Sequence, residues 1–403
     1  MDAPVLKSAP RGRMVLGTNQ SGMRDANERL VLSLVRRHEA LAKSDIARIT
    51  GLSAQTVSVI VRALEHDGLL VRRDPVRGRV GQPSVPIALH PEGAFSFGVK
   101  IGRRSAELVL IDFLGVTRGM LRRAYRYPSP RETVEFVASG VQRLRSTLSH
   151  GEDRRVSGLG IAMPFEMWSW ADAAGAPREV LDEWRHRDIR ADIQAALPFP
   201  VFVENDATAA CGAELVFGSL GDLGDFIYFY LGAFAGGGIV LGGSLYSGRT
   251  GNAGALGSIP VPGPKGPAQL IDIASLATLE RLLAARGRDG AELWSSPETW
   301  SDLGESLDEW VEISASALAY AITSASAVID FQAAVIDGWM PRPVRARLVD
   351  AVREALGTVD AEGLALPDVF EGTVGIHARA MGAASLPLAD RFLFGSGITG
   401  KTM

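Results

Sequence analysis

Small hydrogen-bonding side chains gather near the start of one predicted helix, at Ser53, Gln55, Thr56 and Ser58, and Arg62 follows further along. Side chains of this size can enter a major groove and reach base edges or phosphates. Arg62 has the length and charge to contact a phosphate. The chemistry expected of this group is therefore recognition of double-stranded DNA through hydrogen bonds.

A second polar pair, Asn205 and Asp206, follows a predicted strand with the sequence PVFVEND. A carboxamide beside a carboxylate offers donors and acceptors for adjacent hydroxyl groups. The same pattern is also ordinary capping chemistry, with Asp206 as the cap of a helix predicted over residues 207–217. The sequence leaves both interpretations open.

Three helices are predicted to position the first group. The first covers Asn27–Glu39, with Asp25 or Asn27 as its cap. Its residues at helical spacing form one apolar stripe. The stripe consists of Leu30, Val31, Leu34 and Val35. The second helix begins with Ser44 as its N-cap and ends at Gly51.

The third helix begins at Ser53 and ends at Gly68, and its spacing from the second is typical of a helix-turn-helix. Ala47 is the small residue needed where the helices cross, and Gly51 allows a left-handed turn. Val57 is the buried apolar residue of the third helix. The shared core is predicted to consist of Ile46, Leu52, Val57, Ile60, Val61 and Leu64.

A hairpin is predicted to follow these helices. Leu69–Arg73 reads as a strand and Ser84–Leu89 as its return, so the segment between them forms a wing. Arg77 and Arg79 at its tip are placed to lie along a DNA backbone or to enter a minor groove. The alternative is a three-helix module that contacts only protein.

Charge is distributed unevenly along the chain. Residues 1–80 hold 14 Lys and Arg against 8 Asp and Glu, whereas the whole chain has a net charge of -4. A basic head on an acidic body favours contact between the head and a polyanion. A solvated basic surface would have the same composition.

Length and composition exclude several classes of protein. The 403 residues suffice for two or three domains, and the one cysteine, Cys211, excludes an intramolecular disulfide framework or a zinc site of several thiolates. No apolar run is long enough to span a membrane, and the N-terminus lacks the apolar core of a signal peptide. We expect no bound metal, no membrane contact and a cytoplasmic protein.

The body is predicted to be α/β. Three apolar runs, FSFGVKI, SAELVLI and VTRGMLRRA, indicate an antiparallel meander, and helices then alternate with strands. Strands are expected at 226–231 and 237–241, and after residue 271 only at 333–339. Three strands followed by helix–strand alternation, occurring about twice, favour two α/β lobes with a cleft between them. The expected domains are residues 1–90, 91–205 and 206–403.

Head and body together resemble the ROK family of repressors, open reading frames and kinases, from Gly17 almost to the end of the chain. GLSAQTVSVIVRALEHDGLL resembles the winged head of its repressors, and residues 202–218 its sugar-binding segment. Residues 228–261 resemble its glycine-rich stretch, and residues 327–338 a late helix–strand unit. The resemblance implies a winged helix-turn-helix joined to a two-lobed, actin-like ATPase (ribonuclease H-like) body.

The sequence departs from the family's kinases at both phosphate loops. Lys100 occupies the position of an Asp that helps to place the metal–nucleotide complex, and Arg103-Arg104 replace the first loop. A Lys cannot ligate a cation. The second loop reads GAFA, with Phe234 in place of a small hydroxyl residue. We expect nucleotide binding to be lost and no cofactor to be used, although the arginine pair leaves open the binding of an anion.

The family's zinc and sugar motifs are only partly present. A Gly-His pair is replaced by Gly257-Ser258, and the loop that should supply cysteines, PVPGPKGPAQL, has none. Asn205 and Asp206 match the pair that holds sugar hydroxyls, the Asp being the catalytic base in the kinases. A family Glu is replaced by Ala255. Further ligand contacts are conceivable from Ser258, Glu166 and Trp168, for the last two of which a core or surface role is the alternative.

Three functions are compatible with these features. The first is a DNA-binding regulator, most simply a repressor and not an enzyme, that binds an operator as a homodimer or homotetramer and senses a sugar or sugar derivative between its lobes. The second is a sugar kinase with an added DNA-binding head. The third is a DNA-binding regulator that senses no ligand.

Overall fold

The computed structural model describes residues 20–75, 85–165, 167–170, 178–264, 266–295, 297–298, 300 and 302–393. The chain divides into two compact units, Met1–Ala88 and Leu89–Met403. We call the first unit the head and the second unit the body. The domain boundaries predicted at residues 90 and 205 stay predictions.

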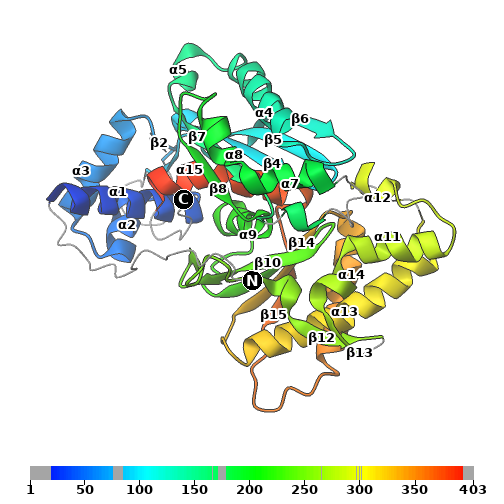
Figure 1. Cartoon of the computed structure of the whole chain (residues 1–403). Helices are drawn as coiled ribbons and strands as arrows, with labels where there is room; N and C mark the ends of the chain where they lie inside the picture. Colours follow the sequence, from blue (N-terminus) through cyan, green and yellow to red (C-terminus); the bar gives the residue numbers. More distant parts are fainter. Residues whose placement is uncertain are drawn as a thin grey trace. The chain divides into compact units, whose positions relative to one another are not determined.

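The head is a helix-turn-helix followed by a small sheet (Figure 1). Its sheet has the strand order β1-β3-β2, in which β1 pairs antiparallel with β3. This is the predicted arrangement of three helices and a returning strand. The elements are α1 (Gln20–Arg37), β1 (Ala40–Leu41), α2 (Lys43–Thr50), α3 (Ala54–His66), β2 (Leu70–Arg72) and β3 (Ile87–Leu89).

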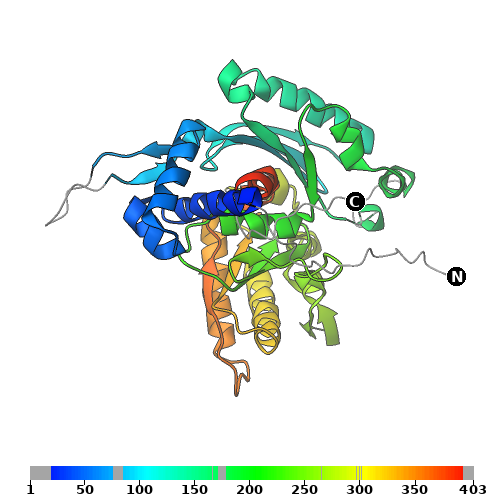
Figure 2. The ribbon, with the colours of Figure 1, turned by 90° about the vertical axis from the view of Figure 1, so that its left-hand side faces the viewer.

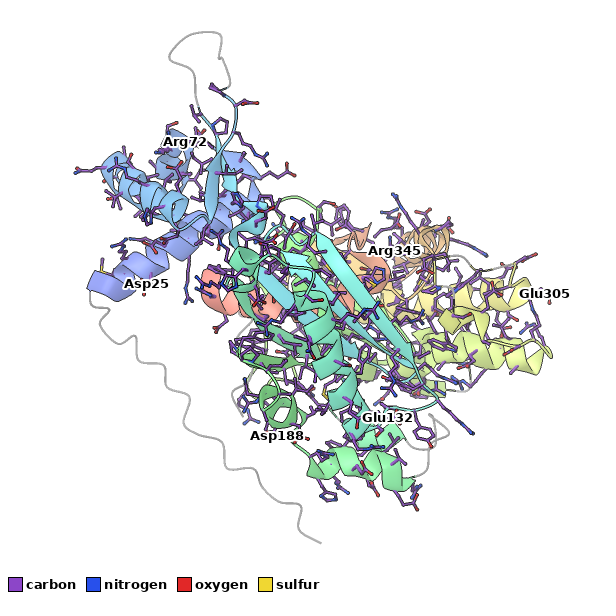
Figure 3. All side chains as sticks on the ribbon, turned by 90° about the horizontal axis from the view of Figure 1, so that it is seen from above. Asp25, Arg72, Glu132, Asp188, Glu305 and Arg345 are labelled. Atoms are coloured by element: carbon purple, nitrogen blue, oxygen red, sulfur yellow. The ribbon has the colours of Figure 1, made fainter. Side chains whose placement is uncertain are left out.

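Two of the three predicted helix starts are wrong. Helix α1 begins at Gln20, so Asp25, on the first helix in Figure 3, and Asn27 lie inside it. Helix α2 begins at Lys43 with Ala42 as its N-cap, and Ser44 is therefore a helical residue. These caps failed because Asp, Asn and Ser are also tolerated inside helices that tertiary packing stabilises.

The core of the head confirms the predicted spacing. Gly51 adopts φ 71° between α2 and α3, in the left-handed region that favours glycine. Its N–H donates to the carbonyl of Ala47 at 3.0 Å. The predicted core residues are fully buried except Leu52, which is half-buried. The buried ones are Ile46, Val57, Ile60, Val61 and Leu64.

The body contains two five-stranded sheets, each with helices on both faces. The first has the order β6-β5-β4-β7-β8 and confirms the meander followed by parallel strands. Helices α4 and α15 lie on its opposite faces (Figure 2). Its elements are β4 (Phe95–Ile101), β5 (Ser105–Asp112), β6 (Thr117–Ala124), α4 (Pro130–Arg145), α5 (His150–Asp153), β7 (Val156–Ala162), α7 (Arg178–His186), α8 (Ile189–Gln194) and β8 (Val201–Glu204).

The second sheet has the order β11-β10-β9-β14-β15. One face packs against α10, α11, α13 and α14 in a large apolar core, and α9 packs against β9 and β10. The elements are α9 (Asp206–Phe217), β9 (Phe226–Leu231), β10 (Ala235–Leu241), β11 (Ser244–Leu245), α10 (Leu270–Ala274), α11 (Leu276–Ala285), α12 (Glu292–Ser295), α13 (Glu305–Ser326), β14 (Ala333–Gly338), α14 (Arg342–Leu356), β15 (Asp368–Glu371) and α15 (Ala378–Phe392).

Two parts of the second half were not predicted. A two-stranded antiparallel hairpin, β12 (Pro260–Gly263) with β13 (Gly266–Gln269), occupies the proline-rich loop. The expectation of one strand after residue 271 was wrong, because β15 adds a parallel partner to β14. The short sequences of β12, β13 and β15 carry too few residues for a period-2 pattern to be recognised.

Helices α9 and α15 pack closely against each other and connect the two halves of the body. Gly382 of α15 lies so near that a Cβ there would collide with the carbonyl of Ala209 on α9. Gly160 of β7 has the same relationship to the carbonyl of Ala383. Glycine therefore allows the backbones to approach, and the start of α15 is held beside the start of α9. No helix in the described part of the chain is both long and apolar enough to cross a bilayer.

Candidate functional site

The N-terminal part of α3 presents the predicted polar face. Gln55 and Arg62 are exposed, whereas Thr56 and Ser58 are half-buried. Ser53 is the N-cap of α3, as predicted, and accepts a hydrogen bond from the N–H of Thr56 at 3.1 Å. The hydroxyls of Ser53 and Thr56 also lie 2.8 Å apart. Ser53 therefore fixes the start of the helix that carries the other side chains.

Val59 extends this face and was missed by the sequence analysis. It lies one turn after Gln55, and 53% of the surface of this residue is exposed. An exposed aliphatic group in a row with Gln55 and Arg62 can contact a thymine methyl group in a major groove. The signal was present in the i, i+4 and i+7 spacing of these three residues.

The strand after α3 is tied to that helix. Arg72 on β2 (Figure 3) donates to both carboxylate oxygens of Glu65, from Nε at 2.7 Å and from Nη2 at 3.1 Å. This hydrogen-bonded partner lowers the pKa of Glu65. Arg77 and Arg79, the predicted wing residues, lie outside the described residues.

A cleft in the body brings together the other predicted residues. It has a volume of about 210 Å³. Asn205 and Asp206 line it at the start of α9, together with residues of the glycine-rich strand β10 and the turn before it. Its lining also includes Arg103, Tyr230, Phe234, Asn252, Ala255, Ser258 and Arg379. The structure therefore gathers Asn205, Asp206 and Ser258 around one cavity.

Asn205, rather than Asp206, is the N-cap of α9. The side-chain oxygen of Asn205 accepts from the N–H groups of Ala207 at 3.0 Å and Thr208 at 3.3 Å. The interpretation of Asp206 as the cap is thus wrong. The amide NH₂ of Asn205 and the carboxylate of Asp206 supply donors and acceptors at the cavity wall.

Asp206 is paired with a cation that the sequence analysis did not identify. Arg379, in the first turn of α15, donates from Nη1 to Oδ2 of Asp206 at 3.2 Å. Its guanidinium carbon also lies 4.8 Å from the ring centroid of Tyr230. Both charged side chains are mostly buried, with 11% and 17% exposed. A separation of 173 residues leaves no local pattern that could reveal this pair.

Lys100 is buried on β4. Its ammonium group donates to the carbonyl of Ser105 at 3.3 Å and meets the Ser105 hydroxyl at 3.1 Å. Burial, with Arg379 adding like-charge repulsion, lowers the pKa of Lys100 to about 7. Lys100 therefore adds a titratable group beside the cleft.

Other charged side chains form ion pairs in the same region as Lys100. Glu107 on β5 bonds with Nδ1 of His377 at 2.9 Å, and this pairing raises the pKa of His377. Arg103 and Arg104 approach Glu280 at 3.8 and 3.5 Å, distances that are long for charge-assisted hydrogen bonds.

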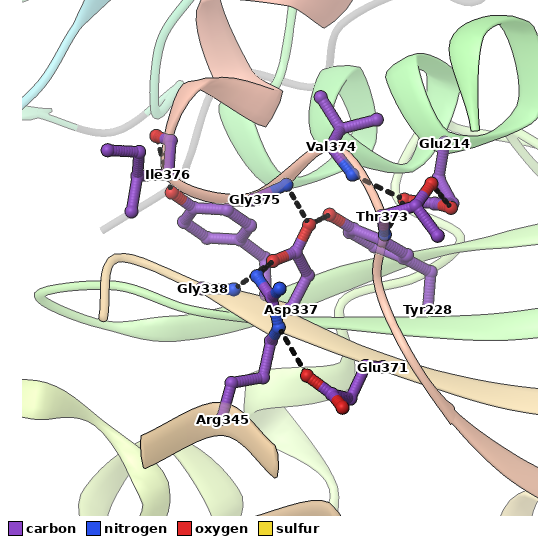
Figure 4. Close-up of polar contacts among 11 residues, drawn as sticks. Glu214, Tyr228, Asp337, Gly338, Arg345, Glu371, Thr373, Val374, Gly375 and Ile376 are labelled. Carbon is purple, nitrogen blue, oxygen red and sulfur yellow. Dashed lines mark hydrogen bonds and ion pairs between the residues drawn. The ribbon is translucent and has the colours of Figure 1, made fainter. Parts of the chain in front are cut away.

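Two buried carboxylates hold the segment that leads into α15 (Figure 4). Asp337 accepts from the N–H of Gly375 at 2.9 Å and from Nη1 of Arg345 at 2.8 Å. Glu214 of α9 accepts from the N–H and the hydroxyl of Thr373 at 2.9 and 2.7 Å. Arg379 is thereby positioned by backbone bonds a few residues earlier in the chain.

The remaining candidates have other roles or lie outside the described residues. Trp168 is half-buried against the core of the first sheet, which fits its core interpretation. Glu166 is outside the described residues. The loop that should supply zinc ligands is the hairpin β12–β13, and the described residues contain no cluster of His, Cys, Asp and Glu suited to a metal.

Comparison with known proteins identifies both units. The profile of the ROK family matches residues 96–389, and that of the MarR family matches residues 21–79. An uncharacterized protein, y4fQ of Sinorhizobium fredii, is 28% identical over 92% of both chains. The xylose repressor of Bacillus subtilis is 23% identical over 61% of this chain and 64% of its own length.

Solved structures show the fold of the body. A ROK family transcriptional regulator, described as a homologue of the E. coli MLC protein, has a TM-score of 0.63 and 17% identity, covering 94% of this chain and 100% of its own. A ROK family glucokinase from Streptomyces griseus has a TM-score of 0.55 and 21% identity, covering 73% and 99%. The body is therefore the two-lobed, actin-like ATPase fold predicted from the sequence.

Proposed function

We propose that this chain, which belongs to the ROK family, is a sugar-responsive transcriptional regulator that represses its target genes. The observation that carries the proposal is the exposed face of α3, formed by Gln55, Val59 and Arg62. Helix α3 is the second helix of a helix-turn-helix whose turn contains the left-handed Gly51. A recognition helix of this kind places its N-terminal residues against base edges in the major groove. The match of residues 21–79 to the MarR family supports this interpretation.

The body senses the effector in the cleft beside α9. Asn205 and Asp206 offer a donor and acceptors to adjacent hydroxyls, which is the chemistry of a sugar or sugar derivative. The xylose repressor and the regulator described as an MLC homologue support a sugar-linked regulatory role. An effector changes DNA binding only through a difference in its affinity for two arrangements of the protein.

The chain acts as a regulator and not as a kinase. Lys100 replaces a carboxylate expected to place a metal–nucleotide complex, and its ammonium cannot bind a cation. The carboxylate of Asp206 is engaged by Arg379, so it is not a free base. The second loop carries the bulky Phe234, which lines the cleft, in place of a small hydroxyl residue. A glucokinase with the same body fold makes sugar phosphorylation the second candidate, which a direct assay must test.

The active species is a homodimer or homotetramer in the cytoplasm. One recognition helix contacts few bases, so two heads that read two half-sites supply the affinity and specificity that operators need. The expected footprint therefore has two related half-sites with centres about 10 base pairs, or a multiple of this, apart.

Genomic footprinting with the purified full chain tests the DNA-binding function. We expect protected sites whose affinity falls steeply as the salt concentration rises, because phosphate contacts release counterions. An affinity that does not change with salt, or protein that protects no fragment, contradicts the proposal. ATP consumption in the presence of a carbohydrate, lost in Asp206→Asn, would establish the kinase instead.

A thermal-shift screen with uncharged sugars and polyols tests the sensing function. A ligand that binds the folded state raises the melting temperature by mass action. A rise that disappears in Asn205→Ala supports the cleft as the site. If the protein binds DNA but none of the ligands changes its melting temperature, it is a regulator that senses no ligand of this class.

A further inference from the structure

A small pocket beside the cleft is lined mainly by basic residues. Nine described residues line it, and five of them are Lys or Arg while none is acidic. The basic residues come from β4 and the turn after it, from β6 and from α15. They are Lys100, Arg103, Arg104, Arg122 and Arg379, and the other lining residues are Ser105, Ala233, Trp294 and Trp339.

Three of these cations surround one indole ring. The Lys100 ammonium lies 5.1 Å from the ring centroid of Trp339, and the guanidinium carbons of Arg122 and Arg379 lie 5.2 and 5.9 Å from it. A ring face attracts cations, but it carries no net charge and cannot neutralise three of them. Like charges held this close repel one another where water is scarce.

Three acidic side chains lie near the five basic ones, so the charge of the pocket is incompletely compensated. Asp206 bonds to Arg379, and Glu107 lies near Lys100. Glu280 is 3.8 Å from Arg103 and 3.5 Å from Arg104, and it also accepts from Nε1 of Trp294 at 3.0 Å. The buried Nε atoms of Arg103, Arg104 and Arg379 have no hydrogen-bond partner among the described residues. Buried donors without an acceptor are rare in native proteins and indicate that an acceptor is missing.

The pocket and the cleft share a wall. Arg103, Ala233 and Arg379 line both cavities, and Arg379 also bonds to Asp206. A ligand whose hydroxyls lie against Asn205 and Asp206 can therefore extend past Arg379 toward the basic residues. Guanidinium groups match the planar geometry of carboxylate and phosphate oxygens, which they bind with paired hydrogen bonds.

We propose that the effector is a polyhydroxylated molecule bearing an oxyanion, either a phosphate or a carboxylate, and that this oxyanion occupies the pocket of Lys100, Arg103, Arg104, Arg122 and Arg379. The inference rests on the proposed sensing function and names the class of its ligand. The hydroxyls face Asn205 and Asp206, and the anion neutralises the cations beside Trp339.

The test measures binding to the purified full chain by calorimetry at fixed ionic strength. The probes are a hexose, the corresponding hexose 6-phosphate, the corresponding hexuronate and inorganic phosphate. We expect one of the two acidic derivatives to bind at least about tenfold more tightly than the neutral hexose, because its hydrogen bonds are to charged donors. The two derivatives distinguish a phosphate from a carboxylate.

Matched variants locate the oxyanion. Arg104→Gln removes a guanidinium that lines the basic pocket but not the cleft, and it should reduce the advantage of the acidic derivative while leaving hexose binding unchanged. Glu280→Gln removes the competing carboxylate and should increase affinity for the acidic derivative. Arg131→Gln, on the exposed surface of α4, is the control and should change neither.

Each outcome separates this inference from the proposed function. Equal affinity for neutral and acidic probes, or an acidic preference that is undiminished in Arg104→Gln, overturns the inference. Absence of binding by every probe, including inorganic phosphate, also overturns it. An acidic ligand that binds tightly but does not change the affinity for DNA supports the pocket and contradicts the sugar-responsive regulator. The affinity for DNA itself is measured in a separate experiment.

Discussion

Arg379 and Asp206 form a mostly buried ion pair between the first turn of α15 and the first residue of α9, with Nη1 and Oδ2 3.2 Å apart. Because Tyr230 also packs against the guanidinium, the cation is held from two sides. The pair joins two helices that bring the halves of the body together, and it forms part of the cleft wall. Stability and ligand binding are therefore coupled at this point.

Removing one partner of this pair should cost more than removing both. Arg379→Met leaves the carboxylate uncompensated and should lower the free energy of unfolding by about 3 kcal/mol. Adding Asp206→Asn to that variant should restore part of the loss, since no buried charge then lacks a partner. Urea unfolding of the two single variants and the double variant measures the coupling. Strictly additive losses would show that the two groups do not interact.

Different residues of α3 should recognise bases and contact phosphates. Gln55→Ala should lower operator affinity about tenfold and change the preferred base at one position, as expected for a residue that reads a base edge. Arg62→Ala should weaken all sequences alike and reduce the slope of log affinity against log salt by about 1. Fluorescence anisotropy with a set of operator variants at several salt concentrations checks both, with Arg131→Ala as the control.

The turn of the head offers a test of backbone strain with a matched control. A Cβ added at Gly51 meets no atom within 4 Å, so Gly51→Ala acts through the left-handed φ alone and should destabilise the head by about 1 kcal/mol. Gly151→Ala, equally free of contacts but inside α5, should have no such effect. Faster hydrogen exchange confined to residues 43–66 of Gly51→Ala is the expected result, and unchanged exchange there would contradict it.

The stability of the body should depend on pH through Lys100. Its pKa is about 7 in the folded protein and ordinarily 10.5, so between these values the unfolded chain binds more protons. The free energy of unfolding therefore rises with pH across this range. Lys100 faces Glu107, Arg122, Asp206 and Arg379 from four other elements. Lys100→Met should abolish the rise, which urea unfolding from pH 6 to 10 measures.

His377 should make the stability of the body depend on pH in the opposite direction. Its partner Glu107 raises the pKa of His377, so the stabilisation is complete below the unfolded pKa of 6.5 and is lost as the pH rises through the folded value. This contribution opposes that of Lys100. His377→Gln should therefore make the rise steeper, and a rise that persists in Lys100→Met would assign it to another group.

Binding of an anion in the basic pocket should be accompanied by the uptake of a proton by Lys100. A bound oxyanion favours the charged form of Lys100 and so raises its pKa above about 7. Affinity for inorganic phosphate should then fall as the pH rises above 7, after allowance for the ionisation of phosphate itself. Calorimetry in two buffers that differ in ionisation enthalpy counts the protons, and Lys100→Met should take up fewer.

Local signals allowed much of the head to be predicted. The roles of Gly51 and Ser53 depend on their own backbone conformation and on residues next to them in the sequence, so a local pattern was enough to predict them. Ser44 failed because its hydroxyl gives the same signal inside a helix as at a cap. In the cleft, sequence adjacency identified Asn205 and Asp206, but the capping role belongs to Asn205.

The rest of the site depends on contacts distant in the sequence. Arg379 reaches Asp206 and Tyr230 only because α15 returns to pack on α9 and on the first sheet. Nothing near Arg379 in the sequence marks it as a cleft residue. The basic pocket has the same origin, since Arg122 lies on β6, Arg103 in the turn after β4 and Arg379 on α15.

The packing of α15 on β4 and β7 also delays the completion of the first half of the body until the end of synthesis. The first sheet is complete when residue 204 has been synthesised, but the helix that covers one of its faces ends at Phe392. At ribosomal speeds the apolar face stays uncovered for about 10–40 seconds, a period in which a nascent chain is prone to aggregate. The head, whose elements end at Leu89, can fold long before. Translation that stops before Ala378 should thus yield a chain with a folded head on a body that depends on chaperones.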